Sequence, residues 1–530
     1  MSSPLFSMSV GEPGSAVSQL KLRTDWLNRN FDLVMASGSP TNWNYPYNID
    51  WQLRPWQQHI QSGQSKNLHY TAHMLAAGET LEQCVSGQLD HRWIPFGQSL
   101  MKFGFNKAII RIGHEMTGNW YAWSSIKKEN LFVSCYRRIV DTLRKSQPSA
   151  NWKFDWNPIP STTLTTLNAV YPGDAYVDYI STDIYDTAYT GQTYPYPLNC
   201  SDSCRLERQK RNWTAIKTNL DRIKKFALSH KKAFALTEWG VWDESFKYGA
   251  GGDNPYFIEQ MYHYINNTSN NIAFHSYFEL ASDGDHRLYS TATKPTAFVK
   301  SAQKFKDLFG LKISLDSIFI NDLKPSAGQS FLMTANLTAN NSTDLVYTTL
   351  YYTNVAGQML GSVRFATTYR AGETQQFKSE GYVLPKELPI GLYNVSVSVH
   401  SIDYKKLIFF KGNIAQFEVL DLFNLKTLSF SNTIADNMFT HNLRMQLIAN
   451  INLSDVLINI YYTDPLGKPV DSKVVSANLL KLQSMDLSWM ARKALSLKTK
   501  GRYYYSVSIY NKQWSKLYYY KNNVAYFDLK

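Results

Sequence analysis

The chain reads Arg111-Ile-Gly-His-Glu-Met-Thr-Gly-Asn-Trp-Tyr-Ala-Trp123 at the end of the apolar, β-branched run Lys107–Ile112. Such a run is typical of a strand that is buried on both faces of a parallel sheet, so Glu115 is expected where this strand ends. In a barrel of parallel strands, the carboxyl ends of the strands form the catalytic face. A carboxylate at that position, surrounded by aromatic residues, is typical of a site that cleaves sugars.

A second carboxylate ends another short apolar run, Ala233–Thr237, and Trp239 and Gly240 follow it. Glu115 and Glu238 therefore form a candidate catalytic pair. Glycoside hydrolysis uses two carboxyl groups, about 5–5.5 Å apart when the anomeric configuration is retained and about 6.5–9.5 Å apart when it is inverted. A single strand-end Glu can be structural, but two of them, each next to Trp and Gly, favour catalysis.

The first motif resembles the strand-four motif of glycoside hydrolase family 26, Arg-x-Gly-His-Glu-Met-Asn-Gly-x-Trp-Tyr. The resemblance covers about residues 1–310, and one position departs from it, since Thr117 stands where the family usually has Asn. It implies a retaining mechanism on a (β/α)8 barrel, with Glu115 as general acid/base and Glu238 as nucleophile.

The resemblance also implies an endo-acting enzyme with β-1,4-mannan as the first substrate to consider. β-1,3-Xylan and mixed-linkage β-glucan lie within the range of the family. A bacterial exopolysaccharide or capsule is the alternative, and Thr117 and the basic C-terminal part of the chain favour it slightly. A barrel that binds carbohydrate without turnover is the alternative of a different class; loss of either Glu would be its mark, and both are present.

Eight apolar runs separated by helical patterns favour a barrel in residues 1–310. We expect its strands at Leu5–Val10, Asp32–Ala36, Asn67–His73, Lys107–Gly113, Trp152–Trp156, Val177–Ile184, Ala233–Thr237 and Ile272–Phe278. Segments 132–146 and 213–229 have apolar residues three and four positions apart with Lys and Arg between them, as outer helices do.

Strand ends also predict residues that support the pair. Alternation along a strand puts Asp183 and Tyr185 on one side, where the family resemblance implies contact with the nucleophile. A Tyr hydroxyl there would donate to Glu238 and keep it ionised. Arg111 shares the parity of Glu115 and needs a carboxylate partner, for which Glu238 or Asp183 would serve. A structural ion pair beneath the site is the other interpretation of this Arg.

His114 precedes the acid/base, and no second His follows within Glu115–Gly118, so the zinc motif His-Glu-x-x-His is absent and no metal is implied. The resemblance implies that this His lines the subsite for the cleaved sugar; a hydrogen-bonded core histidine is the alternative. Aromatic rings suit the apolar faces of sugars. The residues expected to bind substrate in this way are Trp120, Trp156, Trp239 and Trp242. No cofactor is expected.

Residues 311–530 differ from the barrel in having strand-length alternations and many turn residues. They also repeat with an offset of 110, since Leu350-Tyr-Tyr-Thr-Asn354 returns as Ile460-Tyr-Tyr-Thr-Asp464. A module of this length with many short strands is typical of an immunoglobulin-like or jelly-roll β-sandwich. We therefore predict a barrel at 1–310 and two all-β immunoglobulin-like sandwich modules at 311–420 and 421–530.

Positive charge is greater in the repeated part: residues 1–310 carry 32 Lys and Arg against 27 Asp and Glu, and residues 311–530 carry 23 against 15. Nucleic acid is not expected as a partner, because the excess is scattered and no recognition signature is present. An anionic glycan or a cell surface bound through the C-terminal modules is expected instead, with a merely soluble basic surface as the alternative. The aromatic runs Leu407–Phe410 and Leu517–Tyr520 are expected in core strands, with stacking platforms as the alternative.

The sequence shows no apolar run long enough to cross a bilayer and no charged-then-apolar leader. Its four cysteines do not form a disulfide scaffold, but Cys200 and Cys204 could close a small ring, and Cys84 could meet Cys135 across neighbouring helices. We expect an exported protein, secreted, at the cell surface or periplasmic, that acts as a monomer on a polysaccharide.

Overall fold

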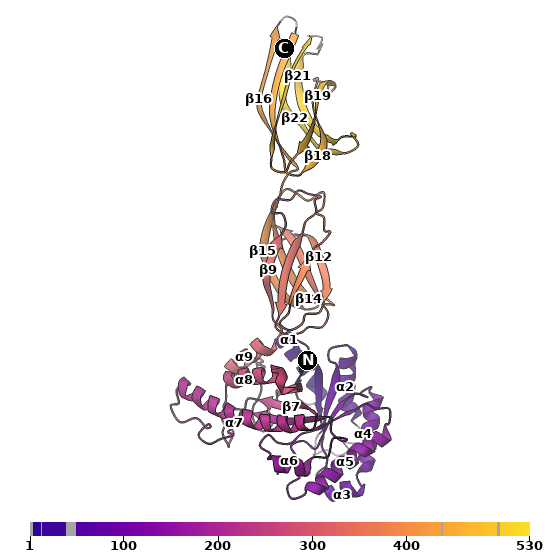
Figure 1. Ribbon diagram of the computed structural model, residues 1–530, viewed down its shortest axis with the longest axis vertical. Helices are drawn as coiled ribbons and strands as arrows, with labels where there is room; N and C mark the ends of the chain where they lie inside the picture. The colour runs from indigo at the N-terminus through magenta and orange to yellow at the C-terminus, as the bar shows by residue number, and fades with distance from the viewer. Residues whose placement is uncertain (1–3, 12, 39–48, 436–437, 495–498, 530) are drawn as a thin grey trace. The chain divides into compact units, whose positions relative to one another are not determined.

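The computed structural model describes residues 4–11, 13–38, 49–435, 438–494 and 499–529. The chain forms two compact units, Met1–Leu311 and Lys312–Lys530 (Figure 1). Helices and parallel strands make up the first unit, and antiparallel strands make up the second.

Eight parallel strands form the framework of the first unit. They are β1 (Leu5–Ser9), β2 (Leu33–Ser37), β3 (Asn67–Ala72), β4 (Ile109–Ile112), β5 (Lys153–Trp156), β6 (Tyr179–Tyr185), β7 (Ala233–Gly240) and β8 (Ile272–Phe278). Strands that follow one another from β2 to β8 pair side by side, and β1 pairs with β8. The ring closes where the backbone N–H of Asp32, just before β2, donates to the carbonyl oxygen of Phe6 in β1 (2.8 Å). The predicted (β/α)8 barrel is confirmed, with each expected strand present to within a few residues.

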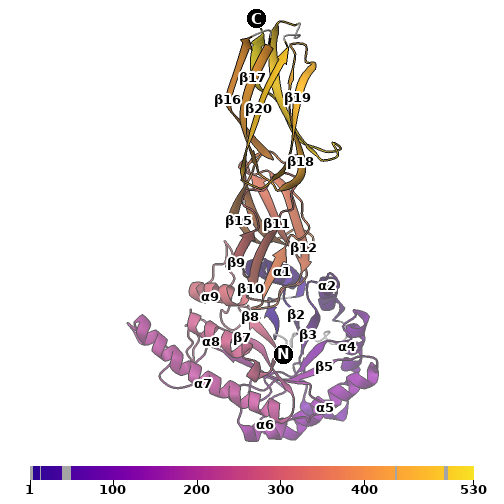
Figure 2. The ribbon, with the colours of Figure 1, turned by 45° about the horizontal axis from the view of Figure 1, so that its top comes forward.

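Helices of the first unit lie outside this ring of strands (Figure 2). They are α1 (Pro13–Leu27), α2 (Asp50–Gln61), α3 (Leu81–Ser86), α4 (Asp90–Lys102), α5 (Glu129–Ser146), α6 (Leu164–Val170), α7 (Asp202–Ser229), α8 (Pro255–Asn266), α9 (Val299–Phe309) and the short 3₁₀ helix η1 (Thr268–Asn270). In α5 the residues Phe132, Ile139 and Leu143 form a buried stripe, which is the amphipathic pattern expected from the sequence. Of the helices described, none is long and apolar enough to span a bilayer.

Helix α7 begins at Asp202, well before the segment 213–229 that the sequence predicted. Its first turns are rich in charged residues, so they show no apolar period that could reveal a helix. The start is fixed instead by a cap, since the hydroxyl of Ser201 accepts the backbone N–H of Cys204 (3.3 Å).

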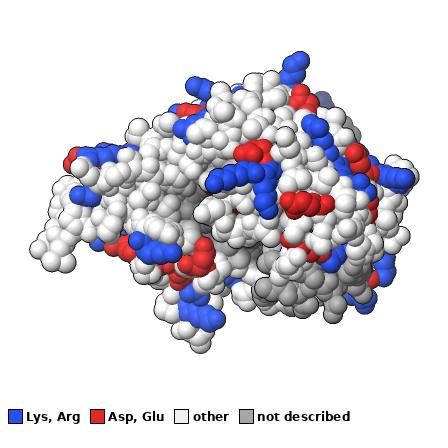
Figure 3. All heavy atoms as spheres, turned by 90° about the horizontal axis from the view of Figure 1, so that it is seen from below, with Lys and Arg blue, Asp and Glu red and all other residues white. Residues whose placement is uncertain are grey.

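Charged side chains of both signs are scattered over the face of the molecule that Figure 3 shows. Lys and Arg lie among Asp and Glu there, and neither sign forms a continuous patch among the residues drawn in colour or white. Nucleic acids are bound through many phosphate contacts at once, which a mixed surface of this kind disfavours.

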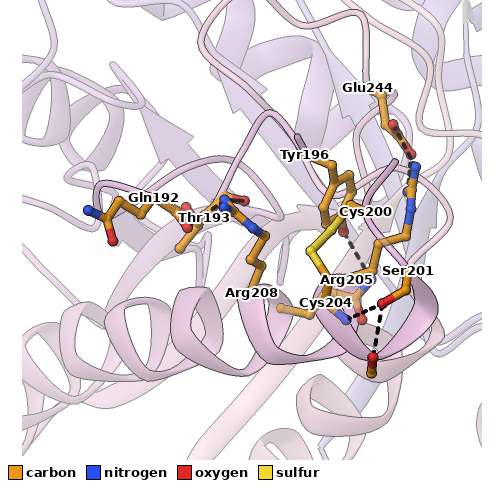
Figure 4. Close-up of a disulfide and its surroundings, with 11 residues drawn as sticks. Gln192, Thr193, Tyr196, Cys200, Ser201, Cys204, Arg205, Arg208 and Glu244 are labelled. Carbon is orange, nitrogen blue, oxygen red and sulfur yellow. Dashed lines mark hydrogen bonds and ion pairs between the residues drawn. A yellow bond between two sulfur atoms is a disulfide. The ribbon is translucent and has the colours of Figure 1, made fainter. Parts of the chain in front are cut away.

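Two disulfides link segments of the first unit. Cys84 of α3 bonds to Cys135 of α5, and Cys200 bonds to Cys204 at the start of α7 (Figure 4). Both pairings that the sequence allowed are therefore present. The first joins two neighbouring outer helices, and the second closes a small ring at the end of the loop that follows β6.

The loop after β6 is held against α7 beside the second disulfide (Figure 4). Arg205 of α7 forms an ion pair with Glu244 (2.7 Å), and its guanidinium lies 4.1 Å from the centre of the Tyr196 ring. One turn later, Arg208 donates to the carbonyl oxygen of Gln192 (2.7 Å). These contacts fix the course of the loop that follows a strand carrying two candidate site residues.

The described residues of the second unit form four antiparallel sheets. Its strands are β9 (Ile313–Ile320), β10 (Met333–Ala339), β11 (Val346–Asn354), β12 (Met359–Thr367), β13 (Thr374–Lys378), β14 (Gly391–Ser401), β15 (Leu407–Val419), β16 (Phe423–Ala435), β17 (Met438–Ala449), β18 (Leu453–Thr463), β19 (Pro469–Leu479), β20 (Ser484–Ala494), β21 (Gly501–Asn511) and β22 (Leu517–Leu529). The sheets are β13-β10-β9 and β12-β11-β14-β15, followed by β16-β17-β20 and β19-β18-β21-β22.

The strand order of the first two sheets recurs in the second two, as the repeat in the sequence predicts. Leu350 is paired with Val397, and 110 positions later Ile460 is paired with Val507. Alternate residues along these strands are buried, which is the pattern of sheets that cover a common core. The predicted β-sandwich class is confirmed, while the division at residue 420 stays a prediction.

Candidate active site

Side chains from β4, β6 and β7 meet at Arg111. Its Nη1 donates to both carboxylate oxygens of Asp183 (3.1 Å each), and its Nη2 donates to Oε1 of Glu238. The hydroxyl of Tyr185 donates to the other oxygen of Glu238, Oε2 (2.8 Å). Both oxygens of this carboxylate therefore accept a hydrogen bond, which fixes the orientation of the carboxyl group.

Arg111 is buried, with only 2% of the residue exposed. Burial opposes its positive charge, but the carboxylates of Asp183 and Glu238 outweigh this effect and raise its pKa. The guanidinium therefore stays charged between two carboxylates. Its Nε also donates to the hydroxyl of Thr71 (3.0 Å), so the fork is fixed on three sides.

Besides Arg111, two residues that the sequence did not reveal hold Asp183 in place. Asn157, which directly follows β5, donates through Nδ2 to Asp183 (3.2 Å) and to the hydroxyl of Thr237 (2.8 Å). The hydroxyl of Thr237 also donates to Asp183 (2.8 Å). Asn157 could have been recognised from its place at the end of a strand, directly after Trp156.

Glu115 lies just beyond β4 in a left-handed backbone conformation, with φ of 52°. Its backbone N–H donates to the carbonyl oxygen (2.8 Å) and to Oδ1 (3.1 Å) of Asn157. A non-glycine residue in this conformation is uncommon and persists where surrounding contacts hold it, which is frequent at functional sites. Asn157 thus links the backbone of the candidate acid/base to the group that supports the candidate nucleophile.

Trp120 contacts the carboxyl group of Glu115 directly, because its Nε1 donates to Oε2 (2.9 Å). Gly118 makes this approach possible. A Cβ atom at that position would lie 2.5 Å from the indole ring, closer than two carbon atoms can pack. The Gly and the Trp of the motif therefore serve one contact, and 55% of Trp120 stays exposed above it.

The pKa of Glu115 is raised to about 7. Burial is the main cause, and the negative charge of Glu238 adds to it; the hydrogen bond from Trp120 and the charge of Arg111 oppose the shift. One carboxyl group of the pair can thus carry a proton near neutral pH while the other is hydrogen-bonded at both oxygens. This division is what a proton donor and a nucleophile require.

Thr117, the one departure from the family motif, is also held in the site. Its hydroxyl accepts the backbone N–H of Ile159 (3.0 Å) and lies 2.7 Å from the hydroxyl of Thr162. The side chain therefore anchors the loop that begins at Asn157, a contact that an Asn would make with different geometry.

His114 is buried, and its ring centre lies 4.6 Å from that of Tyr121 and 5.2 Å from that of His73. Burial and the charge of Arg111 hold its pKa well below the usual range, so the imidazole is neutral. The pKa of His73 is lowered to about 4, chiefly by burial. Nδ1 of each ring has no hydrogen-bond partner among the described residues. His73, just after β3, is thus another residue near the site that the sequence did not single out.

The four Trp residues expected at the rim lie in two different places. Trp120 is exposed, and Trp242 is 8% exposed with its ring 5.2 Å from that of Tyr185. Trp156 and Trp239 are fully buried. Trp156 packs on Phe226 of α7 and Trp239 on Phe305 and Phe309 of α9. Because side chains alternate along a strand, the neighbours of these two residues point inward and they point to the helices.

Among the described residues, no group of three or more His, Cys, Asp or Glu side chains is placed to hold a metal ion.

Residues 106–197 match the model of glycosyl hydrolase family 26, a segment that contains Glu115 and ends before Glu238. Endoglucanase H of Acetivibrio thermocellus is 22% identical over 219 residues, which are 40% of this chain and 22% of that protein. The mannan endo-1,4-beta-mannosidase of Bifidobacterium adolescentis is 28% identical over 149 residues, 27% of this chain and 13% of that protein. The chain thus spans less than a quarter of the length of either curated relative.

Solved structures that resemble this chain include an endo-beta-1,4-mannanase double mutant of Cellulomonas fimi. It is 14% identical with a TM-score of 0.44, and the match covers 79% of this chain and 94% of that one. The catalytic domain of a Bacillus sp. JAMB-750 GH26 endo-beta-1,4-mannanase is 15% identical with a TM-score of 0.43, covering 57% of this chain and 86% of that one. The motif around Glu115 and the family match over residues 106–197 support a glycosyl hydrolase family 26 domain within the first unit.

Proposed function

We propose that the first unit is a retaining, endo-acting β-glycoside hydrolase of a polysaccharide. The observation that carries the proposal is the contrast between two strand-end carboxyl groups. Glu115 is partly buried, accepts a hydrogen bond from Trp120 and has a pKa of about 7, whereas Glu238 accepts hydrogen bonds from Arg111 and Tyr185.

In the first step, the carboxylate of Glu238 attacks the anomeric carbon while Glu115 gives its proton to the glycosidic oxygen. The carbon–oxygen bond to the leaving sugar breaks, and a glycosyl ester of Glu238 forms. Glu115, now ionised, takes a proton from water, and the resulting attack on the anomeric carbon releases Glu238 and the product. Arg111 stabilises Glu238 as a leaving carboxylate in this second step.

Azide rescue tests these roles. Glu238→Ala is expected to abolish turnover and to recover it with azide as the α-glycosyl azide. Glu115→Ala is expected to react with substrates whose leaving group needs no proton and to yield the β-azide. Glu259→Ala, a partly exposed carboxylate on α8, serves as the matched control and should leave turnover unchanged. If both active-site variants gave the same azide anomer, the assignment of roles would be refuted.

β-1,4-Mannan is the first substrate that we propose, because one curated relative is named for it and because of the family resemblance. A bacterial exopolysaccharide or capsule is the second, which Thr117 and the basic C-terminal modules favour; β-1,3-xylan and mixed-linkage β-glucan complete the set. The test is a screen of the purified chain against these polymers with product sizes recorded. Products of intermediate length support internal cleavage, whereas release of a single small sugar would contradict it.

A protein that binds glycan without turnover remains a candidate of another class, and the same screen decides it: binding without any product would refute the hydrolase. For the modules we propose attachment to an anionic glycan, supported by their 23 Lys and Arg against 15 Asp and Glu. We also propose that the chain is exported, since disulfides such as Cys84–Cys135 persist in oxidising compartments, and that it acts as a monomer.

A further inference from the structure

The hairpins that join β14 to β15 and β21 to β22 each carry an aromatic residue in an unfavourable backbone conformation. Tyr404 has φ of 57°, and Trp514, 110 positions later, has φ of 58°. This left-handed region suits Gly and is tolerated by Asn, but it is an outlier for a bulky side chain. An aromatic residue at the same turn position of both copies indicates that the ring itself has a task.

Both rings are held in place and remain accessible. Tyr404 is 43% exposed and stacks on Tyr347 of β11, with ring centres 5.3 Å apart and planes 23° apart. Trp514 is 46% exposed, and its ring centre lies 5.0 Å from that of Tyr510 in β21. A ring that is fixed on one side and open on the other can stack on a planar or amphipathic ligand with little loss of side-chain freedom.

Arg364 adds a guanidinium to the surface that the rings of Tyr404 and Tyr347 form. Tyr347 faces outward from the sheet, since Val346 and Thr348 on either side of it are buried. Arg364 of β12 is exposed, and its Cζ lies 4.9 Å from the Tyr404 ring centre and 5.2 Å from that of Tyr347. Within the described part of the chain, Arg364 makes no ion pair. A guanidinium held in this way is suited to receive a carboxylate through two parallel hydrogen bonds.

Around Trp514 and Tyr510, the positive charge comes from the turn itself and not from a neighbouring strand. Val474 stands at the position equivalent to Arg364, but Lys512 and Lys516 flank Trp514 and are exposed. The acid of the first turn, Asp403, has no counterpart there, because Gln513 stands at the equivalent position. Residues 421–530 as a whole carry 14 Lys and Arg against 7 Asp and Glu. Each hairpin thus combines an open aromatic ring with a cation that complements a negative ligand.

We propose that the two hairpins are binding sites for a polysaccharide that carries carboxylate groups. The ring of Tyr404 or Trp514 stacks on the apolar face of a sugar, while Arg364 or the pair Lys512 and Lys516 binds its carboxylate. The inference goes beyond hydrolysis by the barrel and rests on the proposed attachment of the modules to an anionic glycan. It gives that attachment a location and a ligand class.

Affinity electrophoresis of the full chain in gels that contain polygalacturonate tests the proposal, with neutral mannan and single-stranded DNA as comparison polymers. Tyr404→Asn combined with Trp514→Asn removes both rings and leaves a residue that tolerates the turn. We expect the dissociation constant for polygalacturonate to rise at least about tenfold, as the loss of two stacking contacts implies. Phe319→Ser, which removes an aromatic of β9 that is 58% exposed, is the control and should bind as the parent does.

A second variant separates stacking from charge. Arg364→Gln combined with Lys512→Gln and Lys516→Gln changes only exposed side chains, so it remains informative if the ring variant unfolds. It should weaken binding to polygalacturonate and leave binding to neutral mannan unchanged. Parent-like binding of polygalacturonate by either folded variant, or tighter binding of DNA than of polygalacturonate, would overturn the proposal. Hydrolysis of a short soluble oligosaccharide is measured in parallel, so failure of this inference and failure of the proposed enzymatic activity are distinguishable.

Discussion

The two units of the chain differ in whether their described residues bury charged side chains. In the barrel, Arg111, Asp183 and Asn157 are at most 2% exposed and are joined by hydrogen bonds. In the second unit, residues such as Val507 and Phe527 fill the core, and charged side chains lie outside. Burying charge is unfavourable unless it is fully paired, so a buried charged network indicates chemistry, whereas an apolar core indicates a scaffold that works through its surface.

The strongest test of this contrast replaces one Arg in each unit. Arg111→Met leaves the buried carboxyl group of Asp183 and the partly buried one of Glu238 without their cation, and we expect a loss of about 3–5 kcal/mol in the free energy of unfolding. Turnover should fall by about 100-fold or more, because Glu238 loses a stabilising donor. Arg502→Met removes an exposed ion pair with Asp528 and should leave both quantities unchanged. Equal losses in the two variants, measured by chemical denaturation and initial rates, would remove the distinction between the units.

A second comparison lies within the barrel, between Trp156, which packs on an outer helix, and Trp120, which contacts Glu115. Trp156→Ala should lower the free energy of unfolding by about 3–5 kcal/mol, because it empties a buried site. It should leave KM unchanged. Trp120→Ala should instead raise KM by about tenfold, roughly 1.4 kcal/mol of binding, with little effect on stability. A raised KM in folded Trp156→Ala would show that this residue reaches the substrate after all.

The pH dependence of the rate sharpens the assignment of the acid. Burial and Glu238 raise the pKa of Glu115 to about 7, so kcat/KM should fall as pH rises through about 7 and the proton is lost. The indole of Trp120 lowers this pKa by donating to the carboxylate, so Trp120→Phe should move the alkaline limb to higher pH. If the alkaline limb of kcat/KM stayed at the same pH in Trp120→Phe, a group other than Glu115 would control it.

The same pKa shift predicts a change in stability. Folding raises the pKa of Glu115, so the folded state binds more protons, and its stability falls as pH rises from the ordinary carboxyl range through about 7. Glu115→Gln removes this loss and should raise the melting temperature at pH 8 more than at pH 4. An equal change at both values would contradict the shift.

The smallest effect on chemistry is expected from removal of the second unit. A chain that ends at Leu311 should keep its rate on short soluble oligosaccharides, because the candidate site residues precede that position. Its binding to an anionic polymer should weaken, and the advantage of the full chain should shrink as salt shortens the Debye length from about 10 Å at 0.1 M to about 3 Å at 1 M. A uniform loss of rate on all substrates would assign the modules a stabilising role instead.

The positions of the strand ends and the alternation of side chains along each strand account for the part of the candidate site that the sequence predicts. Parity along β4 and β6 predicts the side on which Arg111 and Tyr185 lie. The contact of Tyr185 with Glu238 is implied by the family resemblance, and Arg111 contacts both of the carboxylates between which the sequence did not decide. The same parity, applied to Trp156 and Trp239, would have placed them toward the helices. Their closeness in sequence to the candidate site residues places them at the rim only if this alternation is ignored.

Other features depend on contacts that a single sequence does not reveal. Asn157 matters because its amide contacts β6, β7 and the backbone N–H of Glu115 beyond β4, and its place at the end of β5 does not by itself show these contacts. The early start of α7 depends on the cap by Ser201 and not on an apolar stripe. The distance between the carboxyl groups of Glu115 and Glu238 stays a prediction, about 5–5.5 Å for a retaining enzyme.

The sharing of one guanidinium by two carboxylates has a consequence for inhibitors. When Glu115 is protonated and both carboxyl groups at Arg111 are ionised, Arg111, Asp183 and Glu238 together carry one net negative charge. The transition state of glycoside cleavage resembles an oxocarbenium ion, so this charge favours it over the neutral substrate. Cationic sugar mimics should therefore bind more tightly than their uncharged analogues. Ionisation of Glu115 adds a second negative charge, so the affinity of a permanently charged mimic should increase over the same pH range in which turnover declines.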